Sequence, residues 1–392
     1  MKEGWTYKKL GEVATFARGL TYSKNDEVEH SNNIVLRSNN IDLIAGKLDF
    51  SELKYLKAGF TIPEEKRLRK GSLFICMSNG SKAHLGKVAY VDKDYGYAFG
   101  GFMGQITPNN DVDGLYLHYA LSSPLYKEYI KSLSEGANIN NLKYKDLAEF
   151  VIKYPSLSEQ QSIVYYLDSA FAKIDAMKAN AEKALNEAKA LFQASLKEML
   201  EPKEGWEEKA LGEVSVFSQG IQVDVNLQTE LCSPGKVRFL RIIDVTQGNV
   251  PPRYIDDPGE KYYLKADEIA MVRYGTVGFV CYGFEGVIAN NLFKISIKDK
   301  SKLQSNYLQY FLKSDIFQSH IRKGVGGAAL PAIKFGDIKH IIVGIPSLSE
   351  QQTIVDYLDS IKSKVDRLQE NFDKISQECD ALKQAILRQV FE

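Results

Sequence analysis

A fifteen-residue stretch occurs twice in this chain and constrains its fold more than any other feature. Residues 155–169 read PSLSEQQSIVYYLDS and residues 346–360 read PSLSEQQTIVDYLDS, so the two copies differ at two positions. A long helical pattern without breaks follows each copy, the first to about residue 200 and the second to the end of the sequence. We therefore expect the rest of the chain to be arranged around two long, related helices.

Each helix is expected to begin inside its copy of the repeated stretch. The proline that opens each copy cannot lie within a helix because it lacks a backbone N–H. Ser158 and Ser349 are predicted N-caps, and Gln161 and Gln352 complete a capping box three residues later. Both helices are thus predicted to start with the same local structure.

The repetition extends beyond the helices to the whole chain. Residues 3–13 (EGWTYKKLGEV) have a counterpart at 204–214 (EGWEEKALGEV), and weaker echoes follow both. A repeat of this length indicates two equivalent modules rather than a solenoid of short units. We predict four parts, namely a domain at 1–154, a helix at 155–201, a second domain at 202–345 and a second helix at 346–392.

Each of the two domains is predicted to mix strands with short helices. Runs of β-branched and aromatic residues are interrupted by Gly and Asn, as expected of short strands. Apolar residues spaced three and four apart predict a helix in each domain. The predicted strands are 33–37, 72–77, 87–91, 237–243, 269–274 and 277–282, and the predicted helices lie near 114–133 and 304–323.

Heptads of apolar residues run along both long helices, a pattern typical of a coiled coil. Pairing within the chain, in antiparallel orientation, would relate the two modules by a pseudo-twofold axis. The predicted fold class is therefore α+β, with an intramolecular antiparallel coiled coil. A coiled coil that dimerises with a second copy is the alternative. The predicted seam residues are Leu167, Ile174, Met177, Ala181, Ala184, Leu191, Leu358, Val365, Leu368, Phe372, Ile375 and Leu382.

Composition and motifs limit the possible functions. There is no run of about 18 apolar residues and no apolar signal core, so a cytoplasmic protein is expected. The four cysteines form no CxxC pair, and the five histidines lack the spacing of metal ligands. The sequence also lacks a GxxxxGK[ST] phosphate loop and the acidic-aromatic-Pro-Pro motif of adenine methyltransferases. We therefore expect no catalytic residue, no metal site and no cofactor in this chain.

Charge is distributed in a way that permits contact with DNA. The net charge is zero, but basic residues exceed acidic ones by three in 1–157 and by one in 201–348. The two helical segments carry the compensating negative charge. The asymmetry is small, so it allows a nucleic-acid partner for the domains without identifying one.

Each of the two modules opens with Gly-Trp and Leu-Gly-Glu-Val, at 4–13 and 205–214, and closes with a P-S-L-S-E-Q-Q element that leads into a long helix. In this combination the chain resembles the specificity subunits of type I restriction–modification systems. The resemblance covers essentially the whole chain. It implies two target-recognition domains, each reading one half of a bipartite, asymmetric site in double-stranded DNA. It also implies that the helices act as spacers and bind two modification (methyltransferase) subunits.

That family resemblance places the chemistry in other subunits. The modification subunits methylate adenine with S-adenosylmethionine, and two restriction subunits add translocation and cleavage that use ATP and Mg²⁺. A different class of function remains open at this point, namely a coiled-coil scaffold whose duplicated α/β modules bind proteins.

Candidate DNA contacts were chosen by side-chain chemistry, since Lys and Arg suit phosphates while Arg, Asn, Gln, Ser and Thr suit base edges. Several lie in loops that follow predicted strands, whereas Lys66, Arg67 and Arg69 belong to the densest basic run, which suits a phosphate clamp better than a base reader. The candidates are Arg18, Tyr22, Lys24, Arg37, Asn39, Asn40, Lys66, Arg67, Arg69, Ser78, Asn79, Ser81 and Lys82 in the first domain, and Gln219, Gln222, Arg241, Asp244, Thr246, Gln247, Arg273, Tyr274 and Thr276 in the second.

Replacing Arg273 with alanine is expected to weaken specific DNA binding by about 1–3 kcal/mol, the range for loss of a bidentate contact to a base. The measurement is a titration of the cognate duplex with the assembled complex. Binding equal to that of the wild type would remove Arg273 from the candidate contacts.

Overall fold

The structure is a computed structural model, and it describes residues 5–42, 46–81, 83–135, 141–323 and 332–392. The chain forms two compact units. The first unit contains Met1–Asn180 and Asp373–Glu392, and the second contains Ala181–Phe372. Each unit therefore holds one α/β domain together with part of each long helix.

The described residues of the first unit form two four-stranded sheets and a two-stranded ribbon. One sheet has the order β2 (Ala14–Arg18), β9 (Met103–Pro108), β6 (Leu73–Cys76) and β7 (Val88–Tyr90). The other has the order β3 (Glu27–Val28), β5 (Lys54–Leu56), β4 (Asn33–Leu36) and β8 (Ala98–Phe99). The antiparallel ribbon pairs β1 (Thr6–Lys9) with β10 (Val151–Tyr154).

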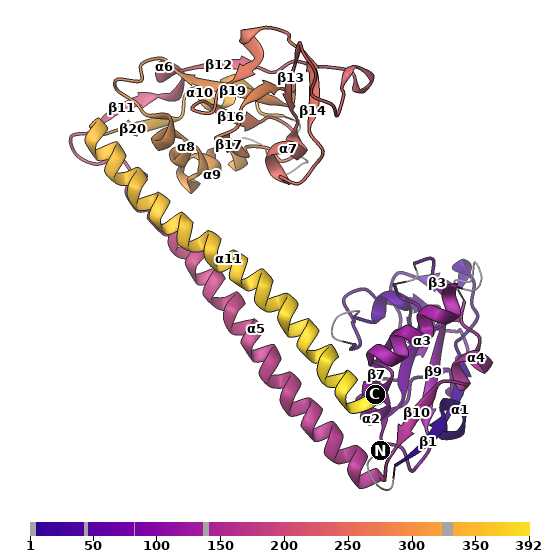
Figure 1. The fold of residues 1–392 in the computed structure, drawn as a ribbon. Coiled ribbons are helices and arrows are strands. Elements are labelled where there is room, and N and C mark those ends of the chain that lie inside the picture. Colours follow the sequence, from indigo (N-terminus) through magenta and orange to yellow (C-terminus); the bar gives the residue numbers. More distant parts are fainter. Residues whose placement is uncertain (1–4, 43–45, 82, 136–140, 324–331) are drawn as a thin grey trace. The chain divides into compact units, whose positions relative to one another are not determined.

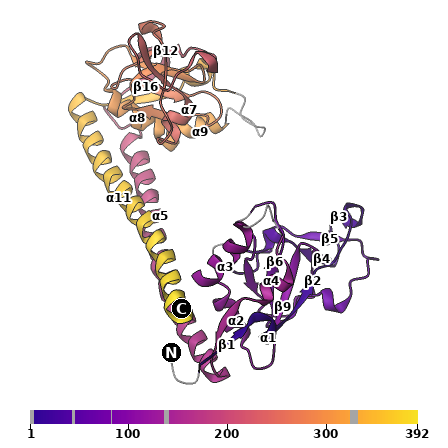
Figure 2. The same cartoon turned by 45° about the vertical axis from the view of Figure 1, so that its right-hand side comes forward.

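Short helices of the first unit pack beside these strands (Figure 2). Helices α2 and α3 contribute to the apolar core that also includes strands β6 and β9 and the last turn of α11. The helices are α1 (Leu10–Val13), α2 (Gly114–Ala120), α3 (Pro124–Glu135) and α4 (Tyr144–Ala148), and 3₁₀ turns lie at Lys24–Asp26, Ser38–Asn40 and Glu64–Lys66.

The second unit repeats this plan. One sheet has the order β12 (Ser215–Gln219), β19 (Leu292–Ile297), β16 (Ile269–Val272) and β17 (Val280–Tyr282). The other has the order β14 (Arg253–Asp256), β13 (Lys236–Leu240), β18 (Gly286–Ile288) and β15 (Tyr263–Leu264). The ribbon pairs β11 (Glu207–Ala210) with β20 (Ile342–Ile345).

The helices of the second unit occupy equivalent places in the chain. They are α6 (Leu211–Val214), α7 (Ile242–Thr246), α8 (Ser305–Lys313), α9 (Asp315–Lys323) and α10 (Phe335–Lys339), with 3₁₀ turns at Val225–Leu227 and Glu260–Tyr262. The sequence predicted one helix near 114–133 and one near 304–323. The structure has two in each place, because Ser123 and Ser314 end the first helix by hydrogen bonding to Ala120 and Phe311.

Two helices of 44 residues, α5 (Leu157–Leu200) and α11 (Leu348–Phe391), pack against each other (Figure 1). In the first unit, Lys178 pairs with Asp380 and Lys383 pairs with Asp175. In the second unit, Lys189 Nζ donates to Gln369 Oε1 (2.8 Å). Residue numbers fall along one helix as they rise along the other, so the pairing is antiparallel. The predicted α+β class with an intramolecular coiled coil is confirmed, while the pseudo-twofold relation stays a prediction.

Part of the predicted seam is wrong. Ile174, Leu185 and Phe192 are buried on α5, whereas Met177, Ala184 and Leu191 are exposed. The buried residues of α5 keep the heptad period, but one of the two buried positions in each heptad lies one residue later than predicted, at 185 and 192 rather than at 184 and 191. The same shift leaves Leu382 exposed near the end of α11.

The physical reason for the shift is contact with the domains as well as with the partner helix. Phe192 packs edge-on against Tyr310 of α8, with ring centroids 6.3 Å apart, and Leu196 and Leu200 enter the same core. A heptad pattern accounts for the partner helix alone, whereas α5 must bury a second face. Larger apolar side chains at 185 and 192 therefore determine the rotation of the helix.

The helix starts also differ from the prediction, by two residues. The cap of α5 is Ser156, whose Oγ accepts from Glu159 N (3.4 Å) while its own N–H donates to Glu159 Oε2 (3.3 Å). At α11, Ser347 Oγ accepts from Glu350 N (3.3 Å). The box is therefore Ser-Leu-Ser-Glu rather than the later Ser-Glu-Gln-Gln, because the carboxylate of a Glu reaches the N-cap from the N3 position.

The first Gln of each repeat is fully buried and joins the helix to its domain. Gln160 Nε2 donates to the carbonyl oxygens of Pro155 (3.0 Å) and Asp111 (3.2 Å), and its Oε1 accepts from Asp113 N (2.8 Å). This one amide therefore makes three hydrogen bonds to the backbone of the loop and of the helix start inside the first unit. Deletion of this amide would leave buried backbone groups without partners.

Gln351 makes the equivalent contacts in the second unit. Its Nε2 donates to the carbonyl oxygens of Pro346 (2.9 Å) and Lys302 (2.7 Å), and its Oε1 accepts from Gln304 N (2.9 Å). The glutamate that bonds to each cap serine also accepts a hydrogen bond from a tryptophan. Trp5 Nε1 donates to Glu159 Oε1 and Trp206 Nε1 donates to Glu350 Oε1, each at 3.1 Å. The Gly-Trp openings and the Ser-Glu-Gln elements are thus two sides of one contact.

A membrane-spanning helix is not found among the residues described here, since none of their helices is both long and apolar enough.

Replacing Gln160 with alanine is expected to destabilise the first unit by about 1–3 kcal/mol, because it removes the hydrogen-bond partner of one buried and two partly buried backbone groups. Urea unfolding followed by circular dichroism measures the change. Gln161→Ala, at the exposed neighbouring position, is the matched control. Equal unfolding midpoints for the two variants would contradict the structural role of Gln160.

Candidate nucleic-acid interface

In each unit a glycine lets the loop after the first sheet strand cross the backbone of another segment. A Cβ on Gly19 would lie 2.0 Å from the carbonyl oxygen of Gly100, and one on Gly220 would lie 2.2 Å from that of Ala289. The neighbouring residue then pairs with the same segment, since Leu20 N donates to Phe99 O (2.7 Å) and Ile221 N to Ile288 O (3.0 Å). Two of the predicted DNA-reading loops are therefore fixed at their bases.

Several candidate contacts of the first unit come together around this crossing. Lys66 Nζ donates to the carbonyl oxygen of Arg18 (2.7 Å), which joins the basic run to the loop after β2. Tyr22 is half-buried in a small core with Leu20 and Val35, and this burial raises the pKa of its phenol. The guanidinium of Arg18 remains exposed at the end of the strand.

The corresponding surface of the second unit carries a chain of amide and phenol groups. Tyr274 OH donates to Asn290 Oδ1 (3.1 Å), and Asn290 Nδ2 donates to Gln222 Oε1 (3.1 Å). Gln222 and Tyr274 were predicted from separate loops, and Asn290 connects them. Amide groups that are exposed and held in position suit hydrogen bonding to base edges.

Two predicted DNA contacts, Asn40 and Asp244, are corrected because their side chains are buried within their own loops. Asn40 Oδ1 accepts from Arg37 N (2.8 Å) and its Nδ2 donates to the carbonyl oxygens of Asp49 and Glu52. Asp244 accepts from Arg238 Nη2 (2.8 Å) and Arg241 Nε (2.7 Å). These groups have no surface left for a base, so they shape the turns after β4 and β13.

Other candidates combine exposure with contacts inside the unit. Arg37 lies 3.6 Å from Glu52, Arg67 lies 3.6 Å from Glu64, and Asn79 Oδ1 accepts from Ser81 N (2.8 Å). Lys82 lies outside the described residues. Those exposed are Arg18, Lys24, Arg69, Ser81, Gln219, Gln222, Gln247, Tyr274 and Thr276, and those half-buried are Tyr22, Arg37, Asn39, Lys66, Arg67, Ser78, Asn79, Arg241, Thr246 and Arg273.

Sequence reasoning missed the segment on which these loops converge. In the first unit it is the turn between β8 and β9, residues 100–102, and in the second it is the turn 289–291 between β18 and β19. Ser78 N donates to Phe102 O (3.0 Å) and Arg273 N to Asn291 O (2.8 Å), so the loop after β6 or β16 also meets it. The Gly-Gly and Asn-Asn pairs in these turns were the available signal.

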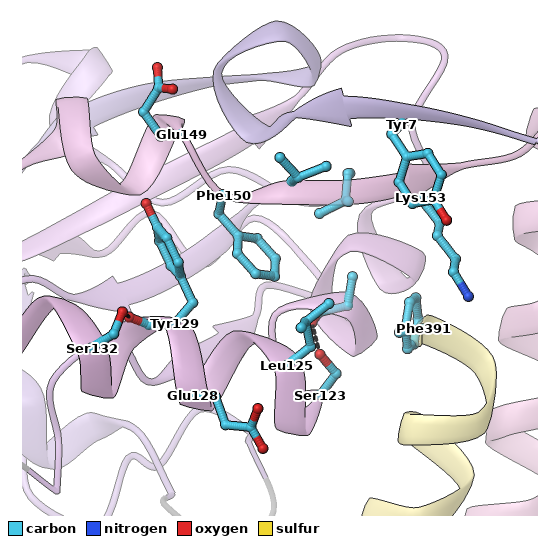
Figure 3. Close-up of a pocket in the computed structure, with 13 residues that line it drawn as sticks. Tyr7, Ser123, Leu125, Glu128, Tyr129, Ser132, Glu149, Phe150, Lys153 and Phe391 are labelled. Atoms are coloured by element: carbon cyan, nitrogen blue, oxygen red, sulfur yellow. Dashed lines mark hydrogen bonds between the residues drawn. The ribbon is translucent and has the colours of Figure 1, made fainter.

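A separate pocket of about 450 Å³ lies in the first unit, between the β1–β10 ribbon, α3 and the end of α11 (Figure 3). Phe150 and Phe391 form part of its apolar lining, and Tyr7 and Lys153 border it from the ribbon. The second unit has Phe311 where Ala120 lines this pocket, at matching places in α8 and α2. No candidate DNA contact lines it.

Titratable groups of the described residues do not assemble into a metal site. Among them, His118 is a buried residue of α2, and desolvation lowers its pKa to about 4. The pKa values of Tyr119 and Tyr310 are raised mainly by burial and then by hydrogen bonds to Asp168 and Asp359. The two tyrosines connect their domains to the long helices, since Asp168 lies on α5 and Asp359 lies on α11.

A protein-family model described as "Type I restriction modification DNA specificity domain" matches residues 2–187 and again 203–377. The chain belongs to this family. It is a DNA sequence-specificity subunit of a type I restriction–modification system, the non-catalytic member of such a complex, with two target-recognition domains.

Known specificity subunits are similar over the full length of the chain. The StySPI specificity subunit of Salmonella potsdam is 27% identical over 421 residues, covering 100% of this chain and 89% of that protein. The EcoKI specificity subunit of Escherichia coli K12 is 26% identical over 429 residues, with the same coverage.

Two solved structures share the fold. A chain from a study of complex assembly and conformational transition in the type I R-M system has a TM-score of 0.78 at 20% identity and covers 99% of this specificity subunit and 97% of its own length. The HsdS subunit from Thermoanaerobacter tengcongensis has a TM-score of 0.57 at 21% identity, covering 100% and 97% respectively.

Gly19→Ala is expected to destabilise the first unit by about 1–3 kcal/mol, because its Cβ would overlap a backbone oxygen that cannot move away easily. Thermal and urea unfolding measure the loss. Gly59→Ala is the control, because a Cβ there meets nothing within 4 Å. A Gly19→Ala variant as stable as Gly59→Ala would show that the crossing is not close-packed.

Proposed function

We propose that this specificity subunit reads a bipartite, asymmetric DNA site, with one half-site bound by each recognition domain. The observation that carries the proposal is the convergence of loops in each unit on a turn at the same topological position. The backbone hydrogen bonds of the two clusters are equivalent, whereas their exposed side chains differ. A shared scaffold with different surface chemistry is what two readers of different half-sites require.

The exposed side chains favour unlike half-sites. The first cluster offers Arg18, Tyr22 and Lys24, which combine charge with an aromatic ring. The second offers Gln219 and Gln222 at the matching loop, so amides replace the cations there. Arginine suits guanine and glutamine suits adenine in the major groove, so the two domains would prefer different bases.

The domain boundaries belong to the same proposal. Residues 1–154 and 202–345 would act as target-recognition domains, and 155–201 and 346–392 as the spacer helices. The helices would fix the length of DNA between the half-sites, since a rigid helix of 44 residues is about 66 Å long at about 1.5 Å per residue.

We further propose that the outer faces of the helices bind two modification subunits. Tyr165, Tyr166 and Met177 are exposed on α5. Leu191 is exposed further along the same helix, and so is Leu382 on α11. Exposed apolar side chains on a packed helix pair favour a protein partner. The modification subunits would use S-adenosylmethionine. Where two restriction subunits join, these would use ATP and Mg²⁺. The complex would act in the cytoplasm.

The alternative, a scaffold whose modules bind only proteins, makes a different prediction for DNA. Gel shifts with co-expressed modification subunits should show sequence-dependent binding that weakens as salt rises, because phosphate contacts release counterions. Binding without sequence dependence would favour the scaffold.

Replacing Arg18 with alanine is expected to weaken binding of the assembled complex to its cognate duplex by about 1–3 kcal/mol, the range for loss of an arginine contact to a base edge. Against a duplex whose first half-site is scrambled, the variant and the wild type should bind equally. Lys145→Ala, an exposed charge in α4, is the control and should match the wild type on both duplexes. A penalty that persists on the scrambled duplex would contradict a base contact of Arg18 in the first half-site, because only contacts to phosphate are independent of sequence.

A further inference from the structure

The turn between β8 and β9 in the first unit has a backbone fixed from three directions. Gly100 N donates to Leu36 O (2.9 Å) at the end of β4, and Met103 N closes the turn on Gly100 O (2.8 Å). The carbonyl oxygen of Phe102 accepts from both Met77 N and Ser78 N, each at 3.0 Å. The chain at Phe102 is therefore held in one conformation.

This turn also lies directly against the loop that follows β2. A Cβ on Gly101 would be 3.3 Å from the carbonyl oxygen of Leu20, and the ring of Tyr22 approaches the position of a Cβ on Gly100 to 3.7 Å. The loops after β2, β4 and β6 hold the candidate DNA contacts of this unit apart from Lys66, Arg67 and Arg69. Phe102 thus lies in a turn that meets the loops after β2 and β6 and the end of β4.

The side chain of Phe102 is exposed although its backbone is fixed. Its exposed fraction is 72%, whereas the next most exposed large hydrophobic residue in the described part of 5–154 is Tyr7, at 55%. Single exposed apolar residues are common and by themselves need no partner. The ring of Phe102 differs from such residues, because its turn is rigid and the loops beside it carry polar and basic side chains.

The second unit has the same turn with different side chains. Ala289 N donates to Leu240 O (2.9 Å), Leu292 N to Ala289 O (2.9 Å) and Arg273 N to Asn291 O (2.8 Å). These bonds repeat those of Gly100, Met103 and Met77, so Asn290 and Asn291 occupy the places of Gly101 and Phe102. An apolar ring in one unit is therefore replaced by amides in the other, on one common backbone.

We propose that Phe102 determines specificity in the first half-site by contacting the 5-methyl group of a thymine in the major groove. The inference rests on the proposed function, in which the first unit reads one half-site. The thymine methyl is the one apolar group that the base pairs present in that groove, and side chains such as Phe recognise it by apolar contact. Asn290, at the adjoining place of the second turn, offers hydrogen bonds instead.

The test uses the full chain assembled with its modification subunits. Selection from random duplexes first defines both half-sites. Each thymine of the first half-site is then replaced in turn by uracil, which removes only the methyl group. The wild-type complex should lose affinity about fivefold to tenfold at one or two of these thymines, in the lower part of the range for one altered base pair.

The Phe102→Ala complex should bind the cognate duplex about tenfold more weakly, as for one mismatched pair, and should no longer respond to uracil at those thymines. Phe102→Leu should fall between the two. Tyr7→Ala, a change at another exposed aromatic residue of the unit, should match the wild type. Circular dichroism melting of each variant shows whether the fold is retained.

Uracil sensitivity that survives in Phe102→Ala would overturn the proposal, and so would a wild-type complex insensitive to every thymine replacement in the first half-site. A further set of duplexes carries the fluorescent base 2-aminopurine in the first half-site. An increase in its fluorescence on binding, without any loss of affinity on uracil replacement, would indicate insertion of the ring between bases and would also overturn the proposal. Failure of the proposed function is recognised separately, since wild-type binding would then be unchanged when the whole first half-site is scrambled.

Discussion

The buried amide of Gln160, repeated by Gln351, is the interaction on which the rest of the structure depends. Each amide ties the first turn of a long helix to a loop of the adjacent domain through three backbone hydrogen bonds. The serine cap and the carboxylate shared with a tryptophan fix the same point from the other side. A helix can position a recognition domain only if its start is rigid, and these contacts make it so.

Internal contacts account for most of the near-identity of the two repeated stretches. The family resemblance implies that the helices bind modification subunits, but the Ser, Glu and first Gln of both copies all have partners inside their own unit. Leu157 and Tyr166, with Leu348 and Tyr357 in the second copy, are identical and exposed. Any contribution of a common partner subunit to the identity therefore falls on these apolar side chains rather than on the polar ones.

The sequence was sufficient for the features that local patterns encode and insufficient for those that tertiary contact decides. Repeats and periodicity predicted the duplication, the two long helices and their pairing. The seam was misplaced at Met177 and Leu191 because α5 also packs on its domains. The position of Asn40 and Asp244 in loops predicts base contacts that their burial excludes, because loop position does not reveal burial. Phe102 was missed because its setting is created by strands distant in sequence.

The division between fixed backbone and variable side chain has an energetic basis. Changes at Gln160 or Gly19 disturb buried or close-packed groups and cost about 1–3 kcal/mol each, a large share of the stability of an ordinary domain. Changes at exposed positions such as Phe102 or Gln222 usually alter stability by less than about 0.5 kcal/mol. A chain built this way can therefore acquire a new target sequence without losing its fold, provided that substitutions fall on the turns and leave the glycine crossings and buried amides intact.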